Sequence, residues 1–184
     1  MLSWLKQANC QGISIGIESG SEKIRKEVLN RLMTNEQIIR AFSTAKEAGL
    51  AVSSFNMVGI PFETRMEIQE TITLNRKIRP NMVAVSTFTP YPGTQLRDSC
   101  QQKGWIKDCD IPSTYIPKSI MNYPNVSVRE ISWWRKTFRF KVLIKSNINK
   151  AFMSLVFDML YEVLLGLKRG TIAHSPVMHD ERVQ

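Results

Sequence analysis

A carboxylate stands at the point where the sequence predicts that a strand ends and a helix begins. Isoleucines at alternate positions of GISIGIESGS, residues 12–21, give this segment a period of two, which predicts a strand with one packed side. Glu18 lies on the other side, at the end of the run. Because α/β proteins bind ligands at the carboxyl ends of their strands, Glu18 is a candidate binding residue from its position alone. The alternative is a solvated acid in a loop.

Helix starts and strand-like runs alternate along the chain. A serine or threonine is followed three positions later by glutamate or glutamine, the spacing of a helix capping box, at four places: Ser19 and Glu22, Thr34 and Gln37, Thr64 and Glu67, Ser127 and Glu130. Mostly apolar runs at 51–59 and 82–89 predict two further strands, and no hairpin signal connects them. This order predicts parallel strands joined by right-handed crossovers. Since three such units leave a sheet edge exposed, we expect earlier strands to complete a barrel.

The composition is that of a globular protein without a metal-binding sequence pattern. The 184 residues are 43% hydrophobic and 22% charged, which suffices for a domain with a hydrophobic core. The three cysteines match no spacing of zinc or iron–sulfur ligands: Cys10, Cys100 and Cys109. His174 and His179 have no acidic or thiol partner in a firm element. We therefore expect reduced thiols, no metal ligands and, without a secretory signal, a cytoplasmic protein.

Basic charge is concentrated near the start of the C-terminal third. The formal net charge is +9, and between Arg129 and Lys150 seven basic residues accompany one acid, Glu130. Four aromatic residues are interleaved with these bases: Trp133, Trp134, Phe138 and Phe140. Such a segment could bind nucleic acid, an anionic lipid or a phosphorylated substrate. A solvated helix face is the interpretation that we favour, because protein surfaces are rich in charge.

The segment after residue 104 changes in character. Residues 105–126 are rich in Pro, Asn and Ser and predict a loop across the mouth of the barrel, followed by the basic helix. Over residues 148–167 apolar side chains recur at helical spacing without a break. Asp158 and Glu162 argue against a membrane span and would repel nucleic acid, so we expect this stripe to pack on the barrel or on a partner. The alternative is an amphipathic helix in peripheral contact with a membrane, flanked by basic residues.

Three segments together resemble the radical S-adenosylmethionine (SAM) superfamily, in particular the group that often carries an N-terminal cobalamin-binding domain. They are GISIGIESGSEKIRKEVLNR (Gly12–Arg31), VSSFNMVGIPFET (Val52–Thr64) and VAVSTFTPYPGTQL (Val83–Leu96). In that family they resemble strands four, five and six of a partial (β/α) barrel. The resemblance implies an α/β fold with half of a TIM-like barrel, three parallel βα units, over residues 1–104. A loop and a mostly helical C-terminal extension would occupy residues 105–184.

The same resemblance implies which residues surround SAM. Glu18, with Ser19 beside it, resembles the polar end of the fourth strand that meets the ribose or methionine part of the cofactor. Arg31 resembles a base that pairs with the methionine carboxylate, a geometry suited to arginine. The adenine would lie against the fifth and sixth strands, where the matching positions are Phe55, Val58, Gly59, Phe88 and Thr89. The phenylalanines could instead be core residues and the arginine a surface base, and no catalytic residue is identified.

The sequence departs from the family at two places. The GLPGET of many relatives is GIPFET here, residues 59–64, so that Phe62 replaces a glycine. The CxxxCxxC motif that binds the family's [4Fe-4S] cluster is absent, and the cysteines of this chain cannot replace it by their spacing. The family's homolytic reaction needs an electron from that cluster, so a chain without these ligands cannot start it alone.

The resemblance therefore implies the C-terminal part of a radical SAM enzyme, an oxidoreductase or a transferase. Its parent would use SAM, a [4Fe-4S] cluster and, in one branch of the family, cobalamin. It would cleave SAM reductively for radical chemistry on a small-molecule substrate that the sequence does not identify. We expect the missing partner to be an N-terminal half with the cluster ligands, and the present chain alone to be inactive. The alternative is a non-catalytic binding module that uses the basic aromatic helix to contact a partner.

Overall fold

Three parallel strands and the helices around them make up the structure. The computed structural model describes residues 2–106, 121–122 and 125–172 of the chain. In chain order the elements are α1 (Leu2–Gln7), β1 (Gly12–Glu18), the π-helix η1 (Ile24–Val28), α2 (Asn35–Glu47), β2 (Ala51–Val58), α3 (Arg65–Ile78), β3 (Met82–Thr87), α4 (Gln95–Gln102), α5 (Val128–Leu143) and α6 (Ile148–Ile172). Together they fit a partial α/β barrel with a helical extension, as the sequence predicted.

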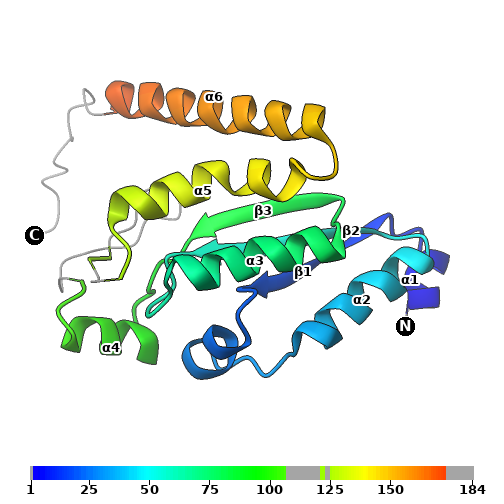
Figure 1. The fold of residues 1–184 in the computed structure, drawn as a ribbon, viewed down its shortest axis with the longest axis horizontal. Helices are drawn as coiled ribbons and strands as arrows, with labels where there is room; N and C mark the ends of the chain where they lie inside the picture. The colour runs from blue at the N-terminus through cyan, green and yellow to red at the C-terminus, as the bar shows by residue number, and fades with distance from the viewer. Residues whose placement is uncertain (1, 107–120, 123–124, 173–184) are drawn as a thin grey trace, which may run out of the picture.

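The strands form one parallel sheet in the order β1, β2, β3. Gly16 of β1 pairs with Phe55 of β2, and Phe55 pairs with Ala84 of β3, so these three residues lie side by side across the sheet. The register of β1 shifts between Gly16 and Glu18. Because all three strands run in the same direction, their carboxyl ends meet at one edge, on the left of Figure 1.

Helices cover one face of this sheet and leave the other open. One cluster of buried apolar side chains joins β1 and β2 to α2 and α3, and a second joins β2 and β3 to α3 and α5. Burying each large apolar side chain contributes about 1.5–3 kcal/mol, so these clusters hold the layers together. On the opposite face, Phe55 and Met82 remain 44% and 51% exposed. That face is therefore open in the described part of the chain.

Three of the four predicted capping boxes are confirmed, namely those begun by Thr34, Thr64 and Ser127. The fourth, Ser19 with Glu22, is wrong. The Ser19 hydroxyl accepts from the N–H of Ser21 at 3.2 Å, and the Glu22 carboxylate accepts from the backbone N–H of Asn35 at 2.6 Å. Ser19 is fully buried 3.4 Å from the hydroxyl of Thr71 in α3, so contacts between elements replace the local cap.

A buried arginine fixes the connection between β1 and α2. Arg25, in η1, is fully buried, and its guanidinium donates to the carbonyls of Ser19 at 2.5 Å and Met33 at 3.1 Å and to the side-chain oxygen of Asn35 at 2.8 Å. A buried guanidinium without acceptors would be strongly destabilising, so these bonds specify the path of the connection. These hydrogen bonds of Arg25 bring the chain after η1 back toward the carboxyl end of β1, where Arg31 lies.

One helix that the sequence did not predict follows β3, before the extension begins. α4 begins at a cap provided by Thr94, whose hydroxyl accepts from the N–H of Arg97 at 3.3 Å. The expected loop at 105–126 lies mostly outside the described residues, as do His174 and His179. The basic helix is confirmed as α5, which packs on α3 and β3.

The last helix, α6, packs on α5 with its polar side inward. Ala151 is fully buried, and Arg139 of α5 donates to the carboxylate of Asp158, with one bond at 3.0 Å. The apolar stripe faces outward instead, and nine of its larger side chains are 50–69% exposed: Phe152, Met153, Val156, Phe157, Met159, Leu160, Tyr161, Val163 and Leu164. Ala151, Leu155 and Phe152 pack toward α5, but most of the expected stripe does not pack on the barrel within the described residues, and packing on a partner stays a prediction. No helix in that part of the chain has the length and apolarity to cross a membrane.

Candidate functional site

The carboxyl end of β1 carries an ion pair on the open face of the sheet. Glu18 adopts a left-handed conformation, with φ of 65°, which turns its side chain back along the strand. Its carboxylate accepts from Arg31 Nη1 at 2.9 Å, while Arg31 Nη2 donates to the carbonyl of Gly16 at 3.2 Å. A Cβ on Gly16 would lie 2.5 Å from Glu18 Oε1, so the absence of a side chain there makes room for the carboxylate.

An exposed aromatic ring lies beside this ion pair. Phe55 projects from the open face of β2 between two of the smallest residues, Gly16 on β1 and Ala84 on β3. Because neither neighbour has a bulky side chain, there is room beside the ring for a flat ligand on this face of the sheet. The open face thus combines a carboxylate, a guanidinium and a ring at one level of the sheet. Such a set can bind a molecule with hydroxyl donors, an anionic group and an aromatic base.

The remaining predicted site residues are buried or half-buried near the carboxyl ends of the strands. Ser19, Val58 and Phe88 are buried, the last two in the cluster under α3 and α5. Gly59 has φ of 76°, so the sharp turn after β2 requires a residue that tolerates this conformation. Thr89 is half-buried, and its hydroxyl donates to the carbonyl of Thr87 at 3.4 Å. The structure thus brings together Glu18, Arg31 and Phe55 on the open face, and a role for the other five in binding SAM stays a prediction.

Sequence reasoning missed a buried acid next to this edge of the sheet. Glu63 is 1% exposed, and its Oε2 accepts from the N–H groups of Gly59 at 2.7 Å and Ile60 at 3.2 Å. Its Oε1 is buried without a hydrogen-bond partner. Burial raises the pKa of Glu63 to about 8, against the effect of the two N–H groups. In the sequence, Glu63 is recognisable as a glutamate four residues after Gly59 in a predicted strand-to-helix connection. That position does not reveal that its side chain is buried.

The substitution of Phe62 for the family's glycine leaves a strained residue in the same turn. Phe62 has φ of 67°, a conformation that glycine adopts without cost. Its ring meets that of Trp105 edge to face, with centroids 5.0 Å apart, and Lys103 Nζ lies 5.6 Å from its centroid. These contacts attach the turn to the segment that follows α4.

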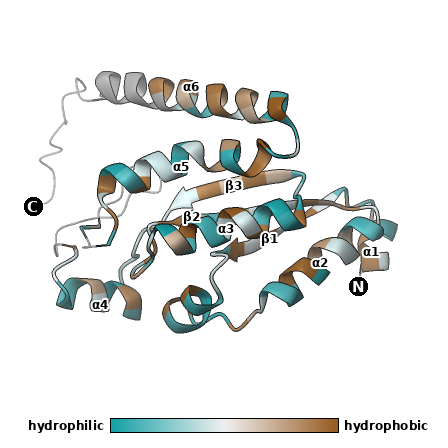
Figure 2. Ribbon diagram, viewed as in Figure 1, coloured by the Kyte–Doolittle hydropathy of each residue, from teal (hydrophilic) through white to brown (hydrophobic). Residues whose placement is uncertain are grey.

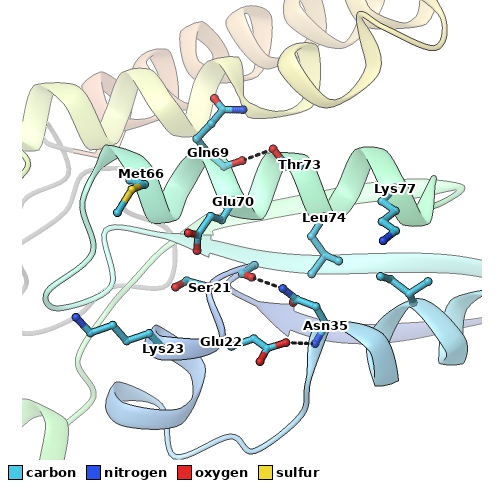
Figure 3. A pocket seen from close by; sticks show the side chains of 12 residues that line it. Ser21, Glu22, Lys23, Asn35, Met66, Gln69, Glu70, Thr73, Leu74 and Lys77 are labelled. Carbon is cyan, nitrogen blue, oxygen red and sulfur yellow. Dashed lines mark hydrogen bonds between the residues drawn. The ribbon is translucent and has the colours of Figure 1, made fainter.

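A large cavity lies elsewhere, between α2 and α3 on the helical side of the sheet (Figure 3). It has a volume of about 750 Å³, and its lining mixes two acids, Glu22 and Glu70, with two lysines, Lys23 and Lys77. Figure 3 shows Glu22 and Asn35 already joined by a hydrogen bond of 2.6 Å. Because side chains of both charge signs are interspersed in its lining, the cavity offers no single chemistry to a ligand.

The described residues do not fit an iron–sulfur cluster. They contain no group of three or more His, Cys, Asp or Glu side chains placed to hold a metal. Cys10 lies before the amino end of β1, and Cys100 is fully buried in α4, where burial raises the pKa of its thiol. Cys109 lies outside the described residues. Cys100 packs beside Val58 and Phe88 at the carboxyl ends of β2 and β3, but a single buried thiol cannot hold a cluster. A cluster next to the ion pair would therefore need ligands from another segment.

The structure does not favour the alternative of a non-catalytic binding module that contacts a partner through the basic aromatic helix α5. Trp134 and Phe138 are buried in the core, and Phe140 packs against Phe152 of α6 at 5.4 Å between centroids. Lys141 lies 3.7 Å from the centroid of Trp133, and burial, with a smaller effect of Arg76, lowers its pKa to about 8. Trp134, Phe138 and Phe140 are thus used within the protein, and Trp133 alone, 52% exposed, is a small platform for stacked bases.

Comparison with known proteins identifies the family. The sequence profile of the radical SAM superfamily matches residues 1–74, the segment that contains β1, η1, α2, β2 and most of α3. The predicted resemblance to the radical SAM superfamily is therefore confirmed for this part of the chain.

Curated relatives agree with this assignment. An uncharacterized methyltransferase of Pyrococcus horikoshii is 40% identical over 93 residues, which is 50% of this chain and 20% of that protein. The anaerobic magnesium-protoporphyrin IX monomethyl ester cyclase of Rubrivivax gelatinosus is 24% identical over 160 residues, 85% of this chain and 27% of the cyclase. A tRNA-2-methylthio-N(6)-dimethylallyladenosine synthase of Petrotoga mobilis is 34% identical over 79 residues, 42% of this chain and 18% of the synthase. The chain thus spans only about a quarter or less of these relatives.

Proposed function

We propose that this chain supplies the SAM-binding strands of a radical SAM enzyme, whose reaction starts with reductive cleavage of SAM. The observation that carries this proposal is the group of Glu18, Arg31 and Phe55 on the open face of a sheet that belongs to this superfamily. The cofactor would use both the polar pair and the ring. The cluster that donates the electron would have to be bound by a segment other than the described residues.

Each residue of the group has a distinct part in the proposed site. The Glu18 carboxylate would accept hydrogen bonds from the ribose hydroxyls of SAM, and the Phe55 ring would lie against the adenine. Arg31 uses two N–H groups for Glu18 and Gly16, and its remaining donors would face the methionine carboxylate. The ion pair would also hold Glu18 in place before the cofactor arrives. The substrate, the choice between methyl transfer and another outcome, and a role for cobalamin remain predictions drawn from the family.

Titration of the chain with SAM, followed by chemical-shift changes in NMR spectra, tests this site without a cluster. Gly16→Ala should weaken binding because its Cβ would displace the Glu18 carboxylate, and Phe55→Ala should weaken it by removing the ring. Losses of about 1–3 kcal/mol are expected for Glu18→Gln and Arg31→Gln, the range for charge-assisted hydrogen bonds.

Met82→Ala is the matched control for Phe55→Ala. Met82 is also exposed on the open face, but it pairs with Ser53, farther from the carboxyl ends of the strands. It should bind SAM as the parent chain does. If SAM perturbs no resonance of Gly16 or Phe55, or if all five variants bind alike while circular dichroism shows them folded, the proposed site is wrong.

A further inference from the structure

The outward side of α6 is apolar, and its exposure to water is energetically unfavourable. Figure 2 shows hydrophobic turns recurring along α6, which forms the outermost layer of the structure. Met153, Val156, Leu160 and Val163 form a seam with spacings of three and four residues, and all are at least half exposed. Asp158 faces α5, whose Arg139 donates to it, and the half-buried Ser154 donates to the carbonyl of Ala151 in its own helix. The helix is therefore amphipathic with its apolar side toward the surroundings, which requires something to cover it.

Further strands of the barrel are not placed to cover this helix. A strand that extends the sheet at β1 would lie beside α2, on the opposite side of the structure from α6 (Figure 1). α5 separates α6 from the sheet, and α6 contacts α5 more than any other element. The occupant of the outward face must therefore approach from outside the barrel.

The flanks of the seam argue against a two-stranded coiled coil in water. Such coils carry charged residues beside the seam, where they select the partner. Here the flanking positions are apolar, namely Phe152, Phe157, Met159 and Leu164. The apolar surface thus covers about half of the helix circumference, at 3.6 residues per turn. A surface of this width suits a broad apolar phase better than a single partner helix.

The charge around α6 has the sign that an anionic membrane attracts. Residues 129–169 contain nine Lys and Arg against three acids. Two of the acids are neutralised within the protein, since Glu130 pairs with Arg65 and Asp158 pairs with Arg139. Lys145 is exposed in the turn that precedes α6. Basic residues next to an apolar helix face are typical of helices that lie in the interface of anionic bilayers.

We propose that α6 binds the surface of an anionic lipid bilayer, lying in its plane with the outward apolar face in the acyl region. This inference is independent of the proposed SAM site, which is formed by other elements. Its occupant is a lipid surface, and the aromatic side chains Phe152, Phe157 and Tyr161 would lie at the level of the headgroups. Lys145 would face the phosphates, as would Lys150 once its ammonium releases the carbonyl of Asn81, to which it donates at 3.3 Å.

Co-sedimentation with vesicles tests this proposal on the full chain. The parent should sediment with vesicles that contain phosphatidylglycerol, and far less with pure phosphatidylcholine. Leu160→Asp should reduce the partition coefficient about tenfold or more, because the lost burial of one leucine corresponds to that factor. Met66→Asp is the matched control, since Met66 is 66% exposed on α3, and it should bind as the parent does. The double substitution Lys145→Gln and Lys150→Gln should weaken binding to the anionic vesicles and make that binding less sensitive to salt concentration.

A second measurement reports direct contact with the acyl region. Val156→Trp should fluoresce more strongly than the parent chain, and brominated lipids should quench the added fluorescence. The proposal is overturned if the parent does not bind anionic vesicles, if Leu160→Asp and Met66→Asp bind alike, or if Leu160→Asp unfolds the chain. It is equally overturned if sedimentation velocity without lipid shows a dimer that Leu160→Asp converts to a monomer, which would make α6 an interface between copies.

Discussion

Replacing Glu63 by glutamine is expected to change how the stability of the protein depends on pH. Burial raises the pKa of Glu63 to about 8, whereas its ordinary value is 4.5. Between these two values the unfolded chain loses a proton that the folded protein keeps at Glu63. The contribution of this group to stability is therefore fully present below pH 4.5 and is lost as the pH rises through about 8.

The size of this effect follows from the two pKa values. One pKa unit corresponds to 1.36 kcal/mol, so the loss between pH 4 and pH 9 amounts to about 4–5 kcal/mol. Glutamine cannot ionise, and its carbonyl can accept the same two N–H groups from Gly59 and Ile60. Glu63→Gln should thus be close to the parent in free energy of unfolding near pH 5 and more stable at pH 9.

Urea denaturation followed by circular dichroism measures the difference between the two proteins at each pH. Taking the difference removes the titration of every other group. Glu47→Gln is the control, since it removes an acid of the same charge from an exposed position at the end of α2. A difference between Glu63→Gln and the parent that stays constant from pH 5 to pH 9 would refute the buried, protonated state of this carboxyl.

Two further substitutions test the turns on either side of the sheet edge. Gly20→Ala should destabilise the protein by about 2–3 kcal/mol in urea denaturation, because its Cβ would overlap the backbone of Glu70 and Thr71 in α3; an equally stable variant would show that the contact yields. Phe62→Gly should be more stable than Phe62→Ala by about 1 kcal/mol, since alanine keeps the strain of a positive φ and both variants lose the contact with Trp105. The reverse order in thermal denaturation would contradict that reason.

Local signals in the sequence predicted the helices and strands well because their causes are local. The capping boxes at Thr34, Thr64 and Ser127 need only residues three positions apart, and all three formed. Ser19 failed as a cap because its hydroxyl is buried against Thr71, which lies 52 residues away in the chain. No local pattern can show that competition.

The arrangement of the candidate site was only partly readable from the sequence. Glu18 and Arg31 were each selected separately, but their ion pair depends on the left-handed backbone at Glu18 and on the space above Gly16. The outward orientation of α6 was missed for a similar reason. Periodicity defines an apolar stripe, but the bond between Arg139 and Asp158 decides which side of the helix faces the protein.

The consecutive order of the strands has a consequence for how this protein folds. Each strand pairs with its neighbour in the chain, β1 with β2 across η1 and α2, and β2 with β3 across α3. Each pairing therefore closes a loop of moderate length, and closure entropy grows slowly with that length. The βα units can therefore dock one after another as the chain leaves the ribosome, with β1 already formed while β3 is still being synthesised. A further strand could then join the free edge of β1 at any later time, from the same chain or from a separate one, without disturbing the units already in place.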